Sequence, residues 1–301
     1  MTGFIGIAKI QHCRKCIRVG IGTLKWYQFP AERMTHSDVR DFRTFGVGAA
    51  KTGTHTIGQM FADRVVSAHE ADAEELIELI LQGKGGQGRA RLREALLRRD
   101  EARKLTIDAS QLNIHLIDEF EQLFNGNRYI QTVRGPISWL RSIIDDSLRR
   151  QTSDVWMRYR RYRFGAPEGH ASAESVLAEH GLHTVSGYLG YWRDAVETVL
   201  AAAPPDRLMI VEVDFIADRA AEIARFAGLE AAAPHSSVPR AFSNRQRFGL
   251  VERIEKGFLL DQCEEICGNT ARRVMPEWSA TADLARATGG LLRLRKRLFG
   301  R

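Results

Sequence analysis

A glycine-rich stretch near residue 50 combines one lysine with several hydroxyl side chains. It lies between the β-rich run 44–47 and a helical pattern, and it reads Gly46-Val-Gly-Ala-Ala-Lys51-Thr52-Gly53-Thr54-His55-Thr56. A loop between a strand and a helix directs backbone N–H groups and the helix dipole at an anion. Lys51 adds a positive charge, and Thr54 and Thr56 add hydroxyl donors. The stretch is therefore predicted to bind a phosphate group.

The order of these residues differs from the Walker A phosphate loop. That pattern ends in Gly-Lys-Ser/Thr, and its terminal hydroxyl binds Mg²⁺. Here Lys51 precedes Gly53 instead of following a glycine. We therefore expect phosphate binding without the usual geometry of a nucleotide and its magnesium ion. A glycine turn that binds no ligand is the alternative.

A second candidate for anion binding follows the β-rich run 129–133. The chain continues as Arg134-Gly135-Pro136, and Ser142 lies eight residues beyond Arg134. Arg134 is expected at the carboxyl end of a strand, where parallel sheets bind ligands. Ser142 is expected two helical turns further on, so both side chains could contact one phosphate. A simple arginine–proline turn is the alternative.

The two motifs together resemble the sulfotransferases that use 3′-phosphoadenosine 5′-phosphosulfate. The similarity covers about residues 43–275 and includes Ile107-Asp108-Ala-Ser110 and the stretch 129–142, as in a bacterial branch of that family. The resemblance implies a metal-independent enzyme whose first loop binds the 5′-phosphosulfate and whose arginine and serine bind the 3′-phosphate. The residues it assigns to the donor are Lys51, Thr52, Gly53, Thr54, His55, Thr56, Arg134 and Ser142.

Two features depart from the family pattern. His55 stands where the family often has serine or threonine, and this change could tune or weaken the handling of sulfate. The glycine- and lysine-rich segment that closes the nucleotide site in cytosolic members is absent. Asn244-Arg245-Gln246-Arg247 occupies about that region, and we expect Arg245 or Arg247 to substitute for it. A solvated loop is the alternative.

Sulfuryl transfer needs charge stabilisation at the leaving oxygen and a base for the acceptor hydroxyl. Lys51 is the candidate for the first task. Glu70 is the first candidate for the base, because it resembles the glutamate base of carbohydrate-type members. His69, His55 and Asp108 follow in that order. A pair His69-Glu70 that merely begins a helix is the alternative.

The elements that must position these residues alternate between strand and helix. Strands are expected at 44–47, 64–67, 105–107, 129–133 and 208–213, and helices from residue 54 and at about 71–81, 89–104, 112–124, 136–149, 186–202, 217–227 and 250–275. Such alternation favours a parallel sheet with right-handed crossovers. The predicted fold is a three-layer α/β/α architecture, similar to that of P-loop NTPases.

The net charge of +7 is concentrated at the two ends. Residues 1–31 and 286–301 hold 5 and 6 basic residues and no acidic ones, which leaves a net charge of −4 on residues 32–285. Nucleic acid is therefore not an expected partner. The basic ends could contact a membrane surface weakly, but solvated tails are the simpler interpretation. Without a signal peptide or an apolar run of transmembrane length, we expect a cytoplasmic protein.

Three segments are expected from this pattern. A basic arm covers 1–40, in which Met34 could be the true start; the sulfotransferase domain covers 41–285; and a basic tail covers 286–301. Residues 150–185 mix arginines with aromatic residues, and we interpret them as a lid or as an insertion at the acceptor site. A sugar or an anionic acceptor would fit them, and so would an ordinary amphipathic helix surface.

Cys13, Cys16, Cys263 and Cys267 form two close pairs. Reduced thiols are expected, and a zinc site with four thiolates is the alternative. Taken together, these features predict a sulfotransferase that acts on a hydroxyl or amine of a carbohydrate, lipid, small molecule or protein tyrosine. A P-loop kinase of small molecules and a non-catalytic, nucleotide-binding relic of a sulfotransferase are the competing interpretations.

Overall fold

The computed structural model describes residues 43–83, 85–229 and 247–289, all within the compact unit Arg40–Arg301. A five-stranded parallel sheet lies at its centre, in the order β2-β3-β1-β4-β5. The strands are β1 (Thr44–Gly46), β2 (Ser67–His69), β3 (Ile107–Ala109), β4 (Arg128–Val133) and β5 (Leu208–Glu212). The predicted parallel sheet is confirmed.

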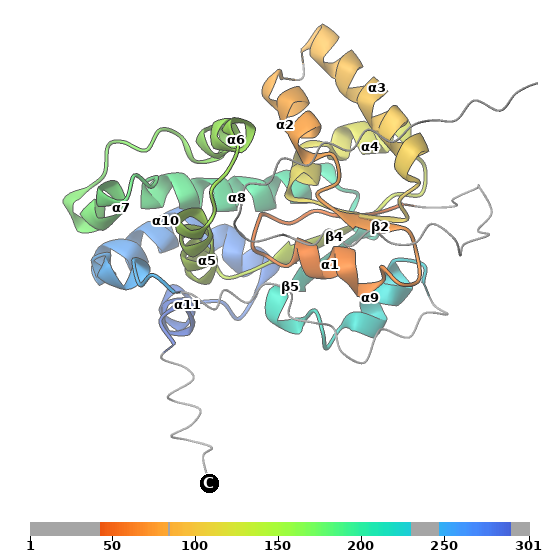
Figure 1. Ribbon diagram of the computed structural model, residues 1–301. Helices are drawn as coiled ribbons and strands as arrows, with labels where there is room; N and C mark the ends of the chain where they lie inside the picture. The colour runs from red at the N-terminus through yellow and green to blue at the C-terminus, as the bar shows by residue number, and fades with distance from the viewer. Residues whose placement is uncertain (1–42, 84, 230–246, 290–301) are drawn as a thin grey trace, which may run out of the picture. The chain divides into compact units, whose positions relative to one another are not determined.

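The side chains of each strand alternate between the two faces of this sheet. Phe45 and Tyr129 belong to one apolar cluster, and Ile107, Ile130 and Val211 belong to the other. Figure 1 shows α1 (Thr54–Met60) and α9 (Ala220–Phe226) on one side of the sheet and α4 (Ile117–Leu123) on the other. Since each face is covered by helices, the expected three-layer architecture is also confirmed.

The remaining helices continue the first apolar cluster, the one that contains Phe45. They are α2 (Ala73–Leu81), α3 (Gly86–Arg103), α5 (Pro136–Arg149), α6 (Asp154–Phe164), α7 (Ser175–Glu179), α8 (Val185–Ala202), α10 (Lys256–Val274) and α11 (Ala280–Ala287). Short 3₁₀ turns lie at Gln111–His115, Ser172–Glu174, Pro205–Arg207, Val213–Phe215 and Val251–Arg253. The expected helix at 112–124 is thus a 3₁₀ turn followed by α4, and the region 150–185 contains α6, the turn Ser172–Glu174 and α7.

The connections after β1 and β4 leave the sheet on opposite faces. Helix α1 follows β1 and packs in the cluster around Ile107, whereas α5 follows β4 and packs in the cluster around Phe45. The two strands are neighbours in the sheet. Ligands of open α/β sheets bind beyond the carboxyl ends of strands at such a switch point. The carboxyl edge of the sheet beyond β1 and β4 is therefore where the topology favours a ligand.

The second and third strands start later than the sequence predicts. Val65, in the expected strand 64–67, still donates its N–H to Phe61, so the turn after α1 continues through this residue. The strand begins at Ser67, which pairs with Ile107. The sequence places this strand too early because Val65 and Val66 have high β-propensity. Pairing with β3, and not β-propensity alone, determines where the strand begins. As a result, His69 lies in β2 and Glu70 directly follows it.

Helix α11, which the sequence analysis did not predict, places a carboxylate at the first turn of α5. Asp283 is buried and accepts hydrogen bonds from the N–H groups of Ile137 (2.8 Å) and Ser138 (3.2 Å). A Cβ atom on Gly135 would lie 2.4 Å from the Asp283 carboxylate, so only glycine allows this approach. Helix α5 is thereby fixed at the end that follows β4.

We expect Asp283→Asn to lower the free energy of unfolding by about 1–2 kcal/mol, because α5 loses a charged acceptor for its first amides. Urea unfolding followed by circular dichroism measures this change. Asp261→Asn on α10 is the matched control, since Asp261 is exposed and none of the contacts found in the described residues involves its side chain. Equal stability of the two variants would contradict the capping role.

The parts of the chain that the structure describes contain no helix long and apolar enough to cross a membrane. Cys263 and Cys267 are buried free thiols on α10, whereas Cys13 and Cys16 lie outside the described residues. No group of three or more side chains suited to a metal occurs among the described residues. The basic arm lies outside these residues, as does the tail from residue 290 onward, so both stay predictions.

Candidate active site

The loop between β1 and α1 is held against β4 by a threonine. Thr52 is buried, its hydroxyl donates to the carbonyl oxygen of Ala49 (2.7 Å), and its Oγ1 lies 2.8 Å from Oγ1 of Thr132. A Cβ atom on Gly48 would lie 2.1 Å from the same Thr132 oxygen, so this position requires glycine. The Thr52 side chain thus supports the loop from within the protein. Gly53, at φ 116°, begins α1 in a conformation that favours glycine.

Lys51, in this loop, forms an ion pair with α5. Its Nζ lies 3.2 Å from Oδ1 of Asp146, which also accepts from Arg149 (2.7 Å) and lies 3.2 Å from Nε of Arg150. Burial lowers the pKa of Lys51, and the Asp146 carboxylate opposes that shift. Lys51 also has a φ of 69°, which is uncommon for residues other than glycine. Backbone strain of this kind is frequent at functional sites.

Two histidines lie beside the loop. His69 Nε2 is 3.2 Å from Oγ1 of Thr54, and the rings of His55 and His69 are 4.8 Å apart. Burial lowers the pKa of His55 to about 4 and that of His69 to about 4. Both imidazoles are therefore neutral at pH 7, so neither brings a positive charge to the site. Thr56 is half-buried one residue further along α1.

Glu70 lies at the carboxyl end of β2 and has a φ of 52°. Its Oε1 accepts a hydrogen bond from Nε2 of Gln111 (2.6 Å), and Oε1 of Gln111 accepts from Nη1 of Arg163 (2.7 Å). Burial raises the pKa of Glu70, while the hydrogen bond from Gln111 and the charges of Arg163 and Arg150 oppose that shift. The carboxylate is thus oriented, close to the loop and more basic than usual, as a general base must be.

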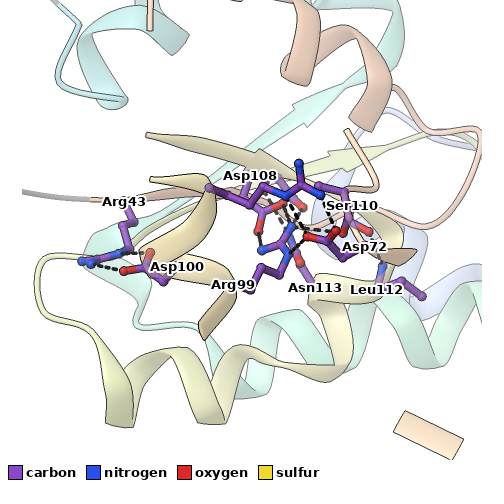
Figure 2. Close-up of polar contacts among 11 residues, drawn as sticks. Arg43, Asp72, Arg99, Asp100, Asp108, Ser110, Leu112 and Asn113 are labelled. Carbon is purple, nitrogen blue, oxygen red and sulfur yellow. Dashed lines mark hydrogen bonds and ion pairs between the residues drawn. The ribbon is translucent and has the colours of Figure 1, made fainter. Parts of the chain in front are cut away.

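Asp108, the fourth candidate for the base, is engaged in an internal ion pair. Figure 2 shows Arg99 of α3 between Asp108 and Asp72. Nη1 and Nη2 of Arg99 donate to the two Asp108 oxygens at 2.5 and 3.1 Å, and Asp108 is only 3% exposed. The backbone carbonyl of Asp108 accepts from Asn113 (2.9 Å). Because Arg99 engages both oxygens of this buried carboxylate, we assign Asp108 a structural role.

Arg134 directly follows β4, at the switch point that the topology favours. The residue is half-buried, and burial lowers the pKa of its guanidinium, while Asp214 and Asp283 act only through electrostatic interaction. Within the described residues, no carboxylate is close enough to form an ion pair with it. Trp192 fixes the backbone here by donating to the Arg134 carbonyl oxygen (3.0 Å). Burying a charged group without a partner costs free energy. An external anion that pairs with Arg134 would offset this cost, so the site is suited to an anionic ligand.

Further arginines lie along α5 near Arg134. Arg141 interacts electrostatically with Arg134 and with Arg247. The residue after Arg247, Phe248, donates its N–H to Oδ1 of Asp145 on the same helix (3.2 Å). The structure thus brings Arg247 near α5, and its side chain is exposed. Arg245, the other residue proposed for this role, lies outside the described residues.

Sequence reasoning missed several residues of this site. Asp146 lies four residues after Ser142 on the same face of α5, and Arg150, four residues further on, directly follows the end of the helix. That spacing is visible in the sequence and could have identified Asp146 and Arg150 once Ser142 was chosen. Ser142 itself is buried. Gln111 and Arg163 carry no comparable signal, because the hydrogen bonds from Gln111 to Glu70 and from Arg163 to Gln111 join residues 41 and 52 positions apart.

No family model matches the sequence, and no curated protein matches it. The chain matches bacterial sulfotransferases in structure over most of its length. A sulfotransferase from Alicyclobacillus acidocaldarius is 14% identical, with 76% of this chain and 97% of that one covered and a TM-score of 0.43. The sulfotransferase domain of the Synechococcus PCC 7002 olefin synthase is also 14% identical, with 82% and 98% covered and a TM-score of 0.35.

The sulfotransferase domain of the curacin biosynthetic pathway is 9% identical, with 83% of this chain and 96% of that one covered and a TM-score of 0.35. Likeness at these identities concerns the arrangement of the elements alone. The function must therefore be argued from the side chains described above, and above all from Arg134, Lys51 and Glu70.

Proposed function

We propose that this protein is a sulfotransferase that moves a sulfuryl group from 3′-phosphoadenosine 5′-phosphosulfate to a hydroxyl acceptor. The observation that carries the proposal is the half-buried residue Arg134. Its guanidinium has no carboxylate partner in the described residues, and it follows β4, the neighbour of the strand that leads into the Lys51 loop. Two separate cationic groups at one switch point suit a ligand with negative charge at both ends.

Each residue has a distinct task in this proposal. Arg134 and Ser142 bind the 3′-phosphate, and Arg247 adds charge on that side. The loop residues Lys51, Gly53 and Thr54 bind the 5′-phosphosulfate. The donor supplies the sulfuryl group: an oxygen–sulfur bond forms to the acceptor, and the bond from sulfur to the bridging phosphate oxygen breaks. Glu70 takes the proton of the acceptor hydroxyl, and Lys51 offsets the charge on the leaving oxygen.

His55 fits this role although the family often has a hydroxyl residue there. Its pKa of about 4 keeps the ring neutral at pH 7, and a neutral imidazole still has one N–H to donate. It can therefore replace a threonine or serine hydroxyl as a hydrogen-bond donor without adding charge. This assignment rests on the ring's burial beside His69 and not on any contact with a ligand.

The test is calorimetric titration of the full chain with 3′,5′-adenosine bisphosphate, the expected product, and with ATP plus Mg²⁺. We expect the bisphosphate to bind in the presence or absence of magnesium. Arg134→Ala is expected to weaken that binding about 10- to 100-fold, the usual loss for a charge-assisted contact. Arg225→Ala, which removes an exposed arginine on α9, is the control for the change in net charge.

The outcomes separate the competing functions. Binding of ATP only with magnesium would favour a kinase and overturn the proposal. Tight binding of the bisphosphate without sulfate transfer to any of a panel of phenols, sugars and hydroxylated lipids would favour a non-catalytic relic. An equal loss of binding in the Arg134 and Arg225 variants would show that Arg134 does not contact the ligand.

A further inference from the structure

The arginines of α6 differ in what they contact. Arg158 forms an ion pair with Glu78 of α2, and Arg161 is exposed. Arg160 and Arg163 are three residues apart, so they share one face of the helix, and both are half-buried. Helix α6 packs against α2 and α8 (Figure 1). Arg160 and Arg163 therefore lie on the partly covered side of α6, toward the candidate active site.

Arg163 is fixed in place by aromatic rings. The central carbon of its guanidinium lies 4.6 Å from the ring centre of Tyr159, 4.5 Å from that of Phe164 and 5.3 Å from that of Tyr191. Its Nη1 donates to Gln111, the residue that also donates to Glu70. Cation–π contacts hold a guanidinium without neutralising it. A positive charge is thus held one side chain away from the proposed base.

Arg160 adds a second charge at the same place. Burial lowers its pKa, and so do Arg163 and Arg150, while Asp146 and Tyr188 raise it. The described residues offer Arg160 neither a hydrogen bond nor an ion pair. The nearest acidic group that influences it, Asp146, is already engaged by Lys51, Arg149 and Arg150. Two guanidiniums on one face of α6, neither bonded to a carboxylate among the described residues, supply the charge that binds an oxyanion.

The position of this pair indicates which substrate it serves. The donor is assigned to Lys51 and Arg134, whereas Arg163 is linked through Gln111 to Glu70, the residue that must contact the acceptor hydroxyl. We propose that the acceptor carries, besides its hydroxyl, a carboxylate, sulfate or phosphate group that Arg160 and Arg163 bind beside Glu70. This inference rests on the proposed function, and it narrows the acceptor to anionic compounds.

The experiment uses the full chain saturated with 3′,5′-adenosine bisphosphate and two matched pairs of probes. Hydroxyphenylacetate is compared with hydroxyphenylacetamide, and glucuronate with glucuronamide, because each pair keeps the hydroxyl groups and differs in one negative charge. Calorimetry gives the affinities. We expect the carboxylate of at least one pair to bind at least about tenfold more tightly than its amide. Arg160→Gln is expected to abolish this difference.

Arg161→Gln is the matched control, since it removes one positive charge from the same helix at an exposed position. It should keep the preference for the carboxylate. Equal affinity within both pairs, or no binding of the carboxylates at millimolar concentration, would overturn the inference. If Arg160→Gln instead weakens binding of the sulfated donor and leaves carboxylate binding intact, Arg160 belongs to the donor site and the inference is wrong.

Because the chain is first saturated with the bisphosphate, failure of the anionic acceptor can be distinguished from failure of the proposed sulfotransferase function. If the bisphosphate does not bind in the first titration, the proposed sulfotransferase fails. If it binds, with the dependence on Arg134 described above, and the carboxylate preference is absent, only the anionic acceptor fails. A transfer assay with the better probe of each pair then reports whether binding at Arg160 leads to sulfation.

Discussion

Replacing Glu70 by glutamine is expected to lower kcat about a thousandfold and to leave the affinity for 3′,5′-adenosine bisphosphate unchanged. Gln111 donates to Oε1 of Glu70 at 2.6 Å, and the amide oxygen of a glutamine can accept the same hydrogen bond. The side chain is therefore expected to keep its place and to lose only its capacity to take a proton. Steady-state sulfate transfer and calorimetry on the same preparation measure the two effects.

The pH profile of the wild-type enzyme tests the same assignment without a substitution. Glu70 must be ionised to act as a base, and burial raises its pKa above the ordinary value of 4.5. kcat/KM should therefore fall as the pH decreases through a value above 4.5. His55 and His69 gain protons only near pH 4. A fall confined to that lower region would identify a histidine as the base.

His69→Asn is the comparison that separates the two neighbours. His69 bonds to Thr54 in the first turn of α1, so its loss should disturb the loop and weaken nucleotide binding as well as turnover. Glu70→Gln should affect turnover alone. If His69→Asn loses turnover with normal nucleotide binding while Glu70→Gln stays active, the roles of the two residues are reversed.

The sequence was sufficient to predict the features that depend on local patterns. The alternation of strands and helices predicted the parallel sheet, and the loop after β1 was recognised from its glycines and Lys51 because strand–loop–helix units have a local signature. Glu70 was chosen as the first candidate for the base even though β2 was expected at 64–67. Because the strand begins and ends later than expected, His69 lies within it and Glu70 directly follows it.

Contacts between distant segments were not predictable from those patterns. The ion pair of Arg99 and Asp108 joins a residue of α3 to one of β3, and nothing near Asp108 in the sequence signals that its charge is engaged. Helix α11 is short, and its role depends on Asp283 reaching α5, which lies about 145 residues earlier in the chain. Asp146 is an intermediate case: its spacing from Ser142 on α5 is local, but only the structure shows that Lys51 contacts it.

Removing the charge of Lys51 is the second large effect that we expect. Lys51→Met keeps the apolar stem and should lower kcat about 100- to 1,000-fold, because the leaving oxygen loses the cation that offsets its developing charge. The fold should tolerate the change, since Asp146 retains Arg149 at 2.7 Å and Arg150 at 3.2 Å. Lys256→Met, at an exposed position on α10, is the control, and an unchanged kcat in Lys51→Met would exclude the lysine from catalysis.

A companion variant distinguishes catalysis by the Lys51 charge from mere support of the loop. Lys51 must be protonated to stabilise the leaving group, and its pKa balances burial, which lowers it, against Asp146, which raises it. Asp146→Asn removes the effect of the carboxylate on the pKa of Lys51 and keeps the effect of burial. The pKa of Lys51 should therefore fall, and activity should be lost at a lower pH on the basic side of the profile. If Lys51 only supported the loop, Asp146→Asn would change the level of activity without moving this basic limb.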